Sequence, residues 1–286
     1  MKIIKYFLEF IVIKLLFIIF KILGYKKGSD FGEIIGKFFG PIFRSKKKII
    51  RNLEISNIGS SNNDRNKIIK EMWGNYGRIL AEYSFLNKFK FGELDDFVEI
   101  HGLENLEKIK KEKKQVVFIS GHFNNFELMA MYIDKFGVDV AAIYRPLNNF
   151  FLNKTMEQIR VNNICKNQIK KGKAGSRELI EMIKKGYSIA LMIDQRVSEG
   201  IYAKLFNKDC LTTTIPAQLI KKYDCEVVPV YVERVNNINF KIYFNRPIIF
   251  DKKQSNLEIT TELNHLLEKM ILKNPNQWIW SHNRWK

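Results

Sequence analysis

The sequence contains few residues of the kinds that build metal, redox or disulfide sites. Its 286 residues include only three cysteines, which lie far apart at Cys165, Cys210 and Cys225. They form neither a C-x-x-C pair nor a His-Cys spacing that would hold a metal. We interpret them as ordinary cytosolic thiols, and the sequence predicts no metal site.

Several enzyme signatures are also missing. No G-x-S-x-G nucleophile elbow occurs, and the segment 171–176 (KGKAGS) lacks the spacing of a phosphate-binding loop. There is no internal repeat or low-complexity linker, and the polar stretch 59–63 is predicted to be a loop. The sequence thus implies no cofactor, and its length and 46% hydrophobic content suit one principal folded domain.

The N-terminal segment lacks a long charge-free run. Residues 6–24 are nearly all apolar, but Glu9, Lys14 and Lys21 interrupt them, so no stretch reaches the roughly 18 residues of a secure membrane span. These charges do not gather on one side of a helix, so the segment is not regularly amphipathic. It suits a helix that spans a bilayer with its lysines reaching the surface, or one that lies in the interface. A buried helix of a soluble protein is the alternative.

The residues after this segment favour a retained anchor over a cleaved signal peptide. No small-residue cleavage site follows; Lys26, Lys27 and the basic run 44–48 follow instead. Basic residues on this flank favour keeping the rest of the chain on the cytoplasmic side, against anionic headgroups. We predict an anchor at residues 1–26 and the main domain at 27–286, with the apolar stretch 31–43 as a further membrane contact.

The charge balance points to an acidic partner. The 48 Lys and Arg residues exceed the 30 Asp and Glu residues, giving a net charge of +18. This excess suits nucleic acid, anionic lipid, a phosphorylated substrate or an acidic carrier protein. Part of it also suits a solvated surface, so charge alone does not choose among these partners.

Beyond a helical region at 52–90, strand-like runs alternate with segments of helical periodicity. Strands are predicted at 97–100, 115–120, 138–143, 188–193, 227–232 and 240–250. Helices are predicted at 103–112, 126–135, 153–162, 176–185, 215–223 and 259–272. This alternation predicts an α/β fold: a largely parallel central sheet flanked by helices, preceded by the N-terminal hydrophobic membrane-anchoring helix.

The stretch 116–127 (VVFISGHFNNFE) carries the clearest chemical signal. An apolar strand runs into Gly121 and His122, and asparagines able to cap a helix follow. His122 thus falls at the carboxyl end of a strand, where open α/β sheets place their ligands. If His122 lies in the turn before the helix, Glu127 can bind one imidazole nitrogen and fix the tautomer. The histidine is then suited to accept a proton from an alcohol that attacks a carbonyl. The alternative is an ordinary turn histidine, with Glu127 complementing the helix dipole.

Over nearly its whole length the sequence resembles the late acyltransferases of lipid A biosynthesis, the lauroyl/myristoyl transferase family of the lysophospholipid acyltransferase-like group. GHFNNFE at 121–127 resembles the family's G-H-F-G-N-W-E, and YRPLNN at 144–149 resembles its Y-R-P-L-x-N. Further matches follow in order at Arg160, at Asp194-Gln195, at KLFN (204–207) with Thr212-Thr213, at VVPV (227–230) and in the tail 275–286.

Asn124, Phe126 and Asn207 depart from the family's Gly, Trp and Gly. Asparagine tolerates a left-handed backbone better than most residues, so both glycine positions survive the change. The departures therefore bear on chain-length and acceptor preference, not on the type of reaction.

The resemblance implies an anchored enzyme on the cytoplasmic face of the inner membrane, with residues 27–286 as its acyltransferase domain. It implies transfer of a chain from acyl-acyl carrier protein, or a coenzyme A thioester, to a hydroxyl of a phosphorylated glycolipid, a lipid A precursor. It implies no cofactor and no nucleic-acid partner. A lysophospholipid or another glycolipid is the alternative acceptor, and a non-catalytic, basic, membrane-tethered binding protein is the alternative of another class.

Within this reading we expect His122 to be the general base and Glu127, the end of the H-x4-E motif, to orient it. Arg160 and Arg145 would bind a phosphate or stabilise developing negative charge; surface or structural ion pairs are the alternative. The full set of expected substrate-binding residues is Asn125, Tyr144, Arg145, Arg160, Asp194 and Gln195. Most of these residues also have a structural alternative. Asn125 also suits a helix cap, and Asp194 and Gln195 also suit a plain strand-end turn. The tryptophans at 278, 280 and 285 suit core packing.

Overall fold

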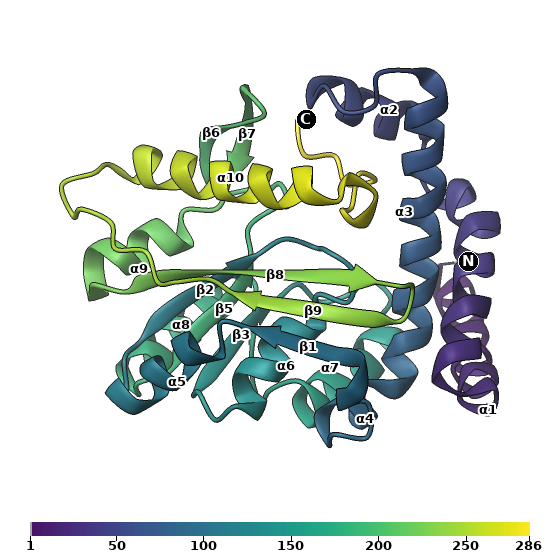
Figure 1. The fold of residues 1–286 in the computed structure, drawn as a ribbon, viewed down its shortest axis with the longest axis horizontal. Helices are drawn as coiled ribbons and strands as arrows, with labels where there is room; N and C mark the ends of the chain where they lie inside the picture. Colours follow the sequence, from purple (N-terminus) through teal and green to yellow (C-terminus); the bar gives the residue numbers. More distant parts are fainter. Residues whose placement is uncertain (1) are drawn as a thin grey trace.

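A mainly parallel sheet forms the centre of the protein, and the structure describes residues 2–286 of the chain as a computed structural model (Figure 1). Its strands are β1 (Val98–His101), β2 (Val116–Ser120), β3 (Val140–Tyr144), β4 (Asn167–Lys170), β5 (Ser188–Met192), β8 (Glu226–Val235) and β9 (Asn239–Phe244). They lie in the order β1-β9-β8-β2-β5-β3-β4, and every neighbouring pair is parallel except β8 and β9. The predicted α/β class with a largely parallel sheet is confirmed.

Helices cover both faces of this sheet. They are α1 (Lys2–Phe43), α2 (Lys46–Ile55), α3 (Asn62–Glu82), α4 (Leu86–Lys90), α5 (Leu103–Glu112), α6 (Glu127–Lys135), α7 (Phe150–Asn163), α8 (Lys173–Lys184), α9 (Ile215–Tyr223) and α10 (Asn256–Lys273). Short 3₁₀ helices occur at Tyr83–Phe85, Asp95–Phe97 and Pro275–Gln277, and β6 (Ile201–Leu205) and β7 (Lys208–Thr212) form a separate hairpin.

The middle strand β2 shows why the sheet is buried on both sides. Val116 and Phe118 belong to one hydrophobic core, and Val117 and Ile119 belong to the other. Because successive side chains of a strand point to opposite faces, a continuous apolar run fills two cores at once. The carboxyl end of β2 therefore emerges from between the two hydrophobic cores.

Two predictions of strand positions were wrong. The predicted strand 240–250 ends at Phe244, because Pro247 cannot donate to a sheet hydrogen bond. The strands β4, β6 and β7 were missed because each has only four or five residues, and β4 and β7 are mainly polar. The β6–β7 turn places Phe206 and Asn207 at φ 51° and 56°, which confirms that the asparagine at this position adopts a left-handed backbone.

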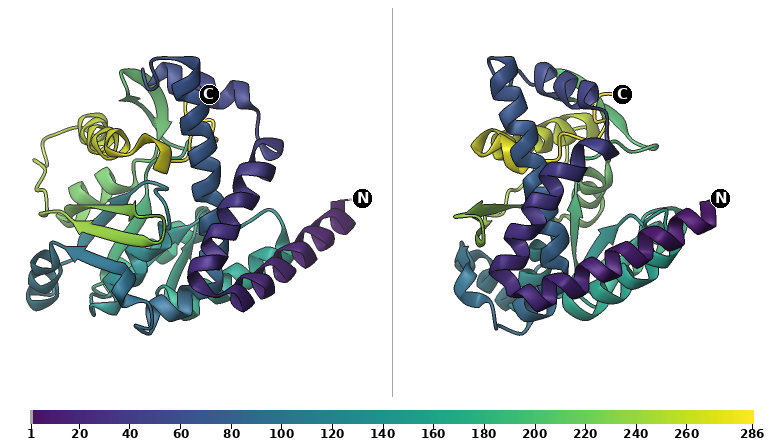
Figure 2. Two further views of the ribbon diagram at one scale, coloured as in Figure 1. Left: turned by 45° about the vertical axis from the view of Figure 1, so that its right-hand side comes forward. Right: turned by 90° about the vertical axis from the view of Figure 1, so that its right-hand side faces the viewer.

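Helix α1 is broken into two arms at Gly24, whose φ of 75° and ψ of 171° are not helical. The second arm packs on α3, while the first arm runs beside α7 (Figure 2). Phe7 and Phe10 of the first arm contact Phe151 of α7, with ring centroids 5.6 and 6.0 Å apart. The break lies two residues before the predicted end of the anchor at residue 26.

The second arm of α1 approaches α3 closely enough that only glycine fits at the crossing. A Cβ on Gly32 would lie 2.4 Å from the Gly77 carbonyl oxygen, and one on Gly77 would lie 1.8 Å from that of Gly32. The buried Arg78 on α3 donates to Ser29, Asp30 and Glu33 of α1, so its charge is compensated across the same contact. This arm is therefore an integral part of the folded domain.

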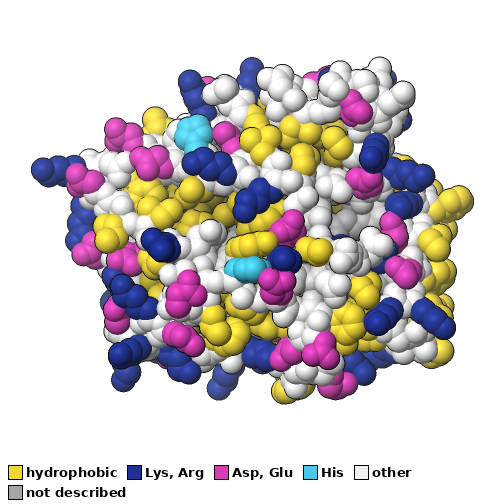
Figure 3. Space-filling model, viewed as in Figure 1, with side chains coloured by type: hydrophobic (Ala, Val, Ile, Leu, Met, Phe, Trp, Pro, Cys, Tyr) yellow, Lys and Arg dark blue, Asp and Glu magenta, His cyan; other side chains and the backbone are white. Residues whose placement is uncertain are grey.

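The first arm presents many apolar side chains to solvent. Its exposed large hydrophobic residues are Ile3, Ile4, Phe7, Leu8, Ile11, Val12, Leu15, Ile18, Ile19, Ile22 and Leu23. Figure 3 shows hydrophobic side chains gathered along the edge of the molecule where α1 lies. Within residues 2–286, no helix has both the length and the apolar character needed to cross a bilayer.

Candidate active site

The loop after β2 carries His122 to the edge of the sheet. Gly121 has no room for a side chain, because a Cβ there would lie 2.8 Å from the Phe123 ring and 2.9 Å from Leu267. Asn124 has a φ of 45°, which confirms the expected left-handed backbone in place of the family's glycine. The chain therefore turns sharply and enters α6 at Glu127.

The neighbouring strand β5 brings Asp194 to the same place. Ser120 of β2 is in register with Met192 of β5, and the Ile193 amide donates to the Ser120 carbonyl at 2.9 Å. Because parallel neighbours end at the same edge, the residues that follow each strand meet there. Asp194 therefore lies at the edge of the sheet beside His122, as we expected from the sequence.

Asp194 binds both the ring and the backbone of His122. Its Oδ1 lies 2.7 Å from Nδ1 of the imidazole, and its Oδ2 accepts the His122 amide hydrogen at 2.7 Å. Burial by itself would raise the pKa of Asp194, but the His122 imidazole and the hydrogen bonds from His122 and Trp278 outweigh burial and hold this pKa at about 2. The ionised carboxylate favours a proton on Nδ1, which leaves Nε2 as the acceptor.

The other side of the imidazole remains accessible. The His122 side chain is 19% exposed, and the Phe126 ring meets it edge-on, with centroids 4.6 Å apart. The Gln195 amide nitrogen lies 3.3 Å from Nε2. Gln195 thus contacts the nitrogen that is suited to receive a proton from a substrate.

Glu127 binds a different set of partners. Its Oε1 accepts from the Tyr83 hydroxyl at 2.5 Å and from Arg160 Nε at 2.9 Å, and Arg160 Nη2 lies 2.7 Å from the same oxygen. Burial, and then the Glu127 charge, raise the pKa of Tyr83 far above its usual range, so the phenol remains a donor. Burial would lower the pKa of Arg160, but Glu127 and Tyr83 reverse this, so the guanidinium stays charged.

This arrangement differs from the prediction that Glu127 orients His122. The orienting contact comes from Asp194, and the hydrogen-bond partners of Glu127 are Tyr83 and Arg160. The difference has a topological cause: His122 precedes the turn at Asn124 and faces β5. Glu127, by contrast, opens α6 and faces the 3₁₀ helix Tyr83–Phe85 and α7. A spacing of five residues does not reveal which neighbouring strand supplies a second carboxylate.

Two buried polar groups beside this pair have no partner among residues 2–286. Arg160 Nη1 makes no hydrogen bond, although the side chain is only 10% exposed. Both amide atoms of the fully buried Asn125 are also unpaired. Buried polar atoms without partners are unusual in folded proteins, and at the edge of a sheet they are suited to meet a polar ligand. Asn125 does not cap α6 through its side chain.

The C-terminal tail closes the site from the other side. Trp278 is buried and donates its indole hydrogen to Asp194 Oδ2 at 2.9 Å. Asn124 Nδ2 donates to Gln277 Oε1 at 2.7 Å, so the tail also fixes the turn after His122. His282 Nε2 accepts the Arg196 amide hydrogen at 2.9 Å. Sequence reasoning assigned Trp278 to core packing, because nothing in the sequence links it to Asp194.

The remaining predicted residues lie at the end of β3 and directly after it. Tyr144 donates to Glu157 Oε1 at 2.6 Å, and the Arg160 guanidinium lies over its ring, 5.3 Å from the centroid. Arg145 is exposed, and its charge helps to lower the pKa of Lys171, after the larger effect of burial. Arg145 and Lys171 together form a positively charged edge of the site, which we call the cationic rim. Tyr83 was not predicted, and no motif marks it.

The three cysteines are buried and free, and within residues 2–286 no cluster of three or more His, Cys, Asp or Glu side chains could hold a metal ion.

An imidazole held by a buried carboxylate next to a buried arginine is suited to proton transfer and to stabilising negative charge. The family model for bacterial lipid A biosynthesis acyltransferases matches residues 1–286. The chain belongs to this family, and it is an O-acyltransferase of the late lipid A type.

Individual relatives are similar at a low level over most of their length. The lipid A biosynthesis palmitoleoyltransferase of Escherichia coli K12 is 23% identical over 260 residues, which cover 89% of this chain and 83% of the relative. The lipid A biosynthesis lauroyltransferase of the same organism is 22% identical over 270 residues, covering 92% and 85%. A crystal structure of a 1-acyl-sn-glycerophosphate acyltransferase from Thermotoga maritima aligns over 96% of this chain and 99% of its own, with 13% identity and a TM-score of 0.42.

Proposed function

We propose that the protein transfers a fatty acyl chain from an acyl thioester, such as acyl-acyl carrier protein, to a hydroxyl group of a lipid A precursor, with His122 as the general base. The observation that carries this proposal is the pairing of His122 Nδ1 with the buried Asp194, which leaves Nε2 as the proton acceptor of a partly exposed ring. The family assignment supplies the class of reaction.

In the proposed reaction the acceptor hydroxyl first takes the place of the Gln195 amide at Nε2 of His122. The base removes the hydroxyl proton as the oxygen attacks the thioester carbonyl, so that a C–O bond forms and a tetrahedral oxyanion develops. When the C–S bond breaks, the protonated imidazole returns its proton to the departing thiolate. No acyl-enzyme is required, and Asp194 stays ionised throughout.

Arg160 is the group we assign to the developing negative charge. Its Nη1 is free to donate, while Nε and Nη2 are held by Glu127. A donor fixed in advance stabilises an oxyanion without having to reorganise during the reaction. In this assignment Glu127 remains essential, but it acts by positioning Arg160 and not by orienting His122.

The cationic rim supports a phosphorylated acceptor and an acidic carrier protein as donor. Arg145 and Lys171 stand close enough for their charges to interact, and Arg145 has no ion-pair partner within residues 2–286. Substrates that carry phosphate or carboxylate groups would be attracted to this edge of the sheet. Asn125, Tyr144 and Gln195 complete the proposed substrate contacts.

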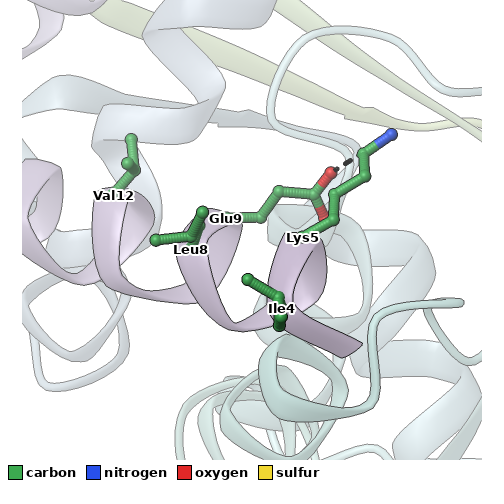
Figure 4. A pocket seen from close by; sticks show the side chains of 5 residues that line it. All are labelled: Ile4, Lys5, Leu8, Glu9 and Val12. Atoms are coloured by element: carbon green, nitrogen blue, oxygen red, sulfur yellow. Dashed lines mark ion pairs between the residues drawn. The ribbon is translucent and has the colours of Figure 1, made fainter. Parts of the chain in front are cut away.

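We further propose that the first arm of α1 anchors the enzyme at the cytoplasmic face of the inner membrane. Ile4, Leu8 and Val12 line one side of a hollow on this arm, next to the Lys5–Glu9 ion pair (Figure 4). Exposed apolar residues in such number suit burial among lipid headgroups and chains, with the lysines reaching the surface. In this proposal residues 1–26 form the anchor and 27–286 the acyltransferase domain.

The reaction is tested with purified protein, acyl-acyl carrier protein and a tetra-acylated lipid A precursor, with the product identified by mass spectrometry. We expect one added acyl chain, and no product with a lysophospholipid acceptor. Transfer to the lysophospholipid alone would replace the proposed acceptor, and no transfer from any thioester would contradict the proposal.

The anchor is tested by vesicle flotation of the full chain and of a variant in which Phe7, Leu8 and Ile11 are changed to Ser. We expect the variant to remain folded and to lose most of its vesicle binding, since each buried apolar side chain contributes about 1.5–3 kcal/mol. Unchanged flotation would contradict the assignment of this arm.

A further inference from the structure

A basic hollow lies at one end of the helical layer, and none of the residues that line it makes a hydrogen bond or ion pair with His122, Asp194, Glu127 or Arg160. It has a volume of about 220 Å³ and lies between the end of α1, the start of α2 and α3. Figure 2 shows the second arm of α1 leading into α2 at this end of α3. The residues that line it are Lys37, Pro41, Arg44, Lys46, Asn66, Ile69, Lys70 and Trp73. None of them belongs to the active site, and none is a carboxylate.

The cations of this hollow are poorly neutralised by the protein. Lys37 is paired with Glu33 on its own helix. Within residues 2–286, Arg44, Lys46 and Lys70 make no ion pair. Three uncompensated charges around a single hollow attract an anion more strongly than the same charges scattered over a surface.

The start of α2 adds to this positive potential. Lys46 is the first residue of a ten-residue helix whose capping residue, Ser45, makes no side-chain hydrogen bond to the helix. The first backbone amides of a helix lack partners inside it, and the helix dipole places partial positive charge at this end. Such a terminus beside lysine and arginine side chains is suited to a phosphate group.

The helix side next to the hollow is apolar and exposed. Lys37 and Pro41 lie along one side of α1, because about four residues make one helical turn, and Arg44 follows directly after the helix ends at Phe43. Phe38 and Ile42 each follow one position later and occupy the adjoining side, where they are 72% and 74% exposed. A ligand that matches both surfaces has an anionic head joined to apolar chains.

We infer that this hollow binds the phosphate of an anionic membrane phospholipid, whose acyl chains lie against Phe38 and Ile42. The phospholipid is bound and not consumed, so this site is separate from the one that holds the substrates. Binding here would fix the second arm of α1, and with it the folded domain, at the membrane surface. The inference rests on membrane association and does not depend on the chemistry at His122.

The test uses the full-length protein and a short-chain phosphatidylglycerol that stays monomeric in water, so that general attraction to a charged bilayer is absent. Trp73 lines the hollow, so its fluorescence changes when the lipid binds there. The Trp73→Phe variant shows how much of the total tryptophan emission comes from this residue. We expect a saturable change in emission for wild type. The Arg44→Ala/Lys70→Ala variant should bind at least tenfold more weakly, because charge-assisted contacts to the phosphate are lost.

The matched control is Lys184→Ala/Lys185→Ala, which removes the same charge from the end of α8, on the opposite side of the molecule (Figure 1). This control should bind phosphatidylglycerol like wild type. An equal loss of affinity in both double variants would show that net charge alone causes the loss, and this would overturn the inference. An equal response to inorganic phosphate would make this a simple anion site and would also overturn it. The inference would also be overturned if the Arg44→Ala/Lys70→Ala variant lost affinity for the lipid A precursor but kept its affinity for phosphatidylglycerol. Because no acyl transfer is measured, the result stands apart from the proposed reaction.

Discussion

Trp278 and His122 share one oxygen of Asp194: the indole hydrogen of Trp278 is donated to Oδ2 at 2.9 Å, while the backbone amide of His122 is donated to the same atom at 2.7 Å. The other oxygen, Oδ1, is left for the imidazole. A residue near the end of the chain therefore helps to fix a carboxylate that follows β5 and a histidine that follows β2. The three segments are joined through a single buried charge.

Trp278→Phe is predicted to lower turnover about tenfold while leaving substrate affinity nearly unchanged. Phenylalanine keeps an aromatic ring in the core but removes the donor to Asp194, and hydrogen bonds to charged groups contribute about 1.5–3 kcal/mol. The pKa of Asp194 should rise towards its usual value, and the acid limb of the pH–rate profile should move to higher pH. Steady-state kinetics across pH measure both effects.

The control for this variant is Trp280→Phe, because the Trp280 indole donates to the Pro275 carbonyl and not to Asp194. If both variants lose turnover equally with unchanged pH profiles, Trp278 contributes packing alone.

Glu127→Gln is predicted to lower the free energy of unfolding by about 3 kcal/mol, because it leaves the buried Arg160 guanidinium without its counter-charge. Turnover should fall as well, since Arg160 is no longer held. The cost of Glu127→Gln should be strongly non-additive with that of Arg160→Gln, and a double-mutant cycle on turnover measures this coupling. Glu157→Gln, which removes a more exposed carboxylate from α7, should cost less than about 1 kcal/mol. Full additivity at Glu127 and Arg160 would contradict the assigned role.

His282 is predicted to make stability depend on pH between about 6.5 and 4. Burial is the main cause that lowers its pKa from 6.5 to about 4, and the charges of His122, Arg284 and Arg145 lower it further against the opposing effect of Asp194. The unfolded chain therefore binds a proton in this range that the folded chain excludes, so stability is complete above pH 6.5 and falls as the pH drops towards 4. Denaturant unfolding of wild type and His282→Gln should show a weaker pH dependence in the variant. Parallel curves would show that His282 is not the group responsible.

The fold was largely predictable because its main strands carry strong local signals. The strand β2 reads as an apolar run that ends in Gly121, and such a run must be buried on both faces. The strand β4 carries three polar residues in its four positions, so a search for apolar runs does not detect it. The break in α1 at Gly24 was not predicted, because a single glycine also occurs inside continuous helices, and the sequence marks only the change from apolar residues to Lys26 and Lys27.

Several residues near His122 were predicted, but Tyr83 was missed, and the pairing of His122 with Asp194 was not predicted. His122 and Asp194 were both placed at strand ends, and both lie at the site. Asp194 meets the imidazole because β5 lies next to β2 in the sheet. Local sequence patterns predict strands but not the order in which the strands pair. The same limit explains why Trp278, which is 84 residues from Asp194, was assigned to packing.

The most direct test of the account is the single-turnover rate of acyl transfer by His122→Ala, measured with saturating acyl-acyl carrier protein and lipid A precursor. We predict a loss of about 10²- to 10⁴-fold with unchanged melting behaviour, and a loss in the same range for Asp194→Asn. A His122→Ala protein that transfers the acyl chain within about twofold of the wild-type rate would contradict the central claim that this imidazole is the base.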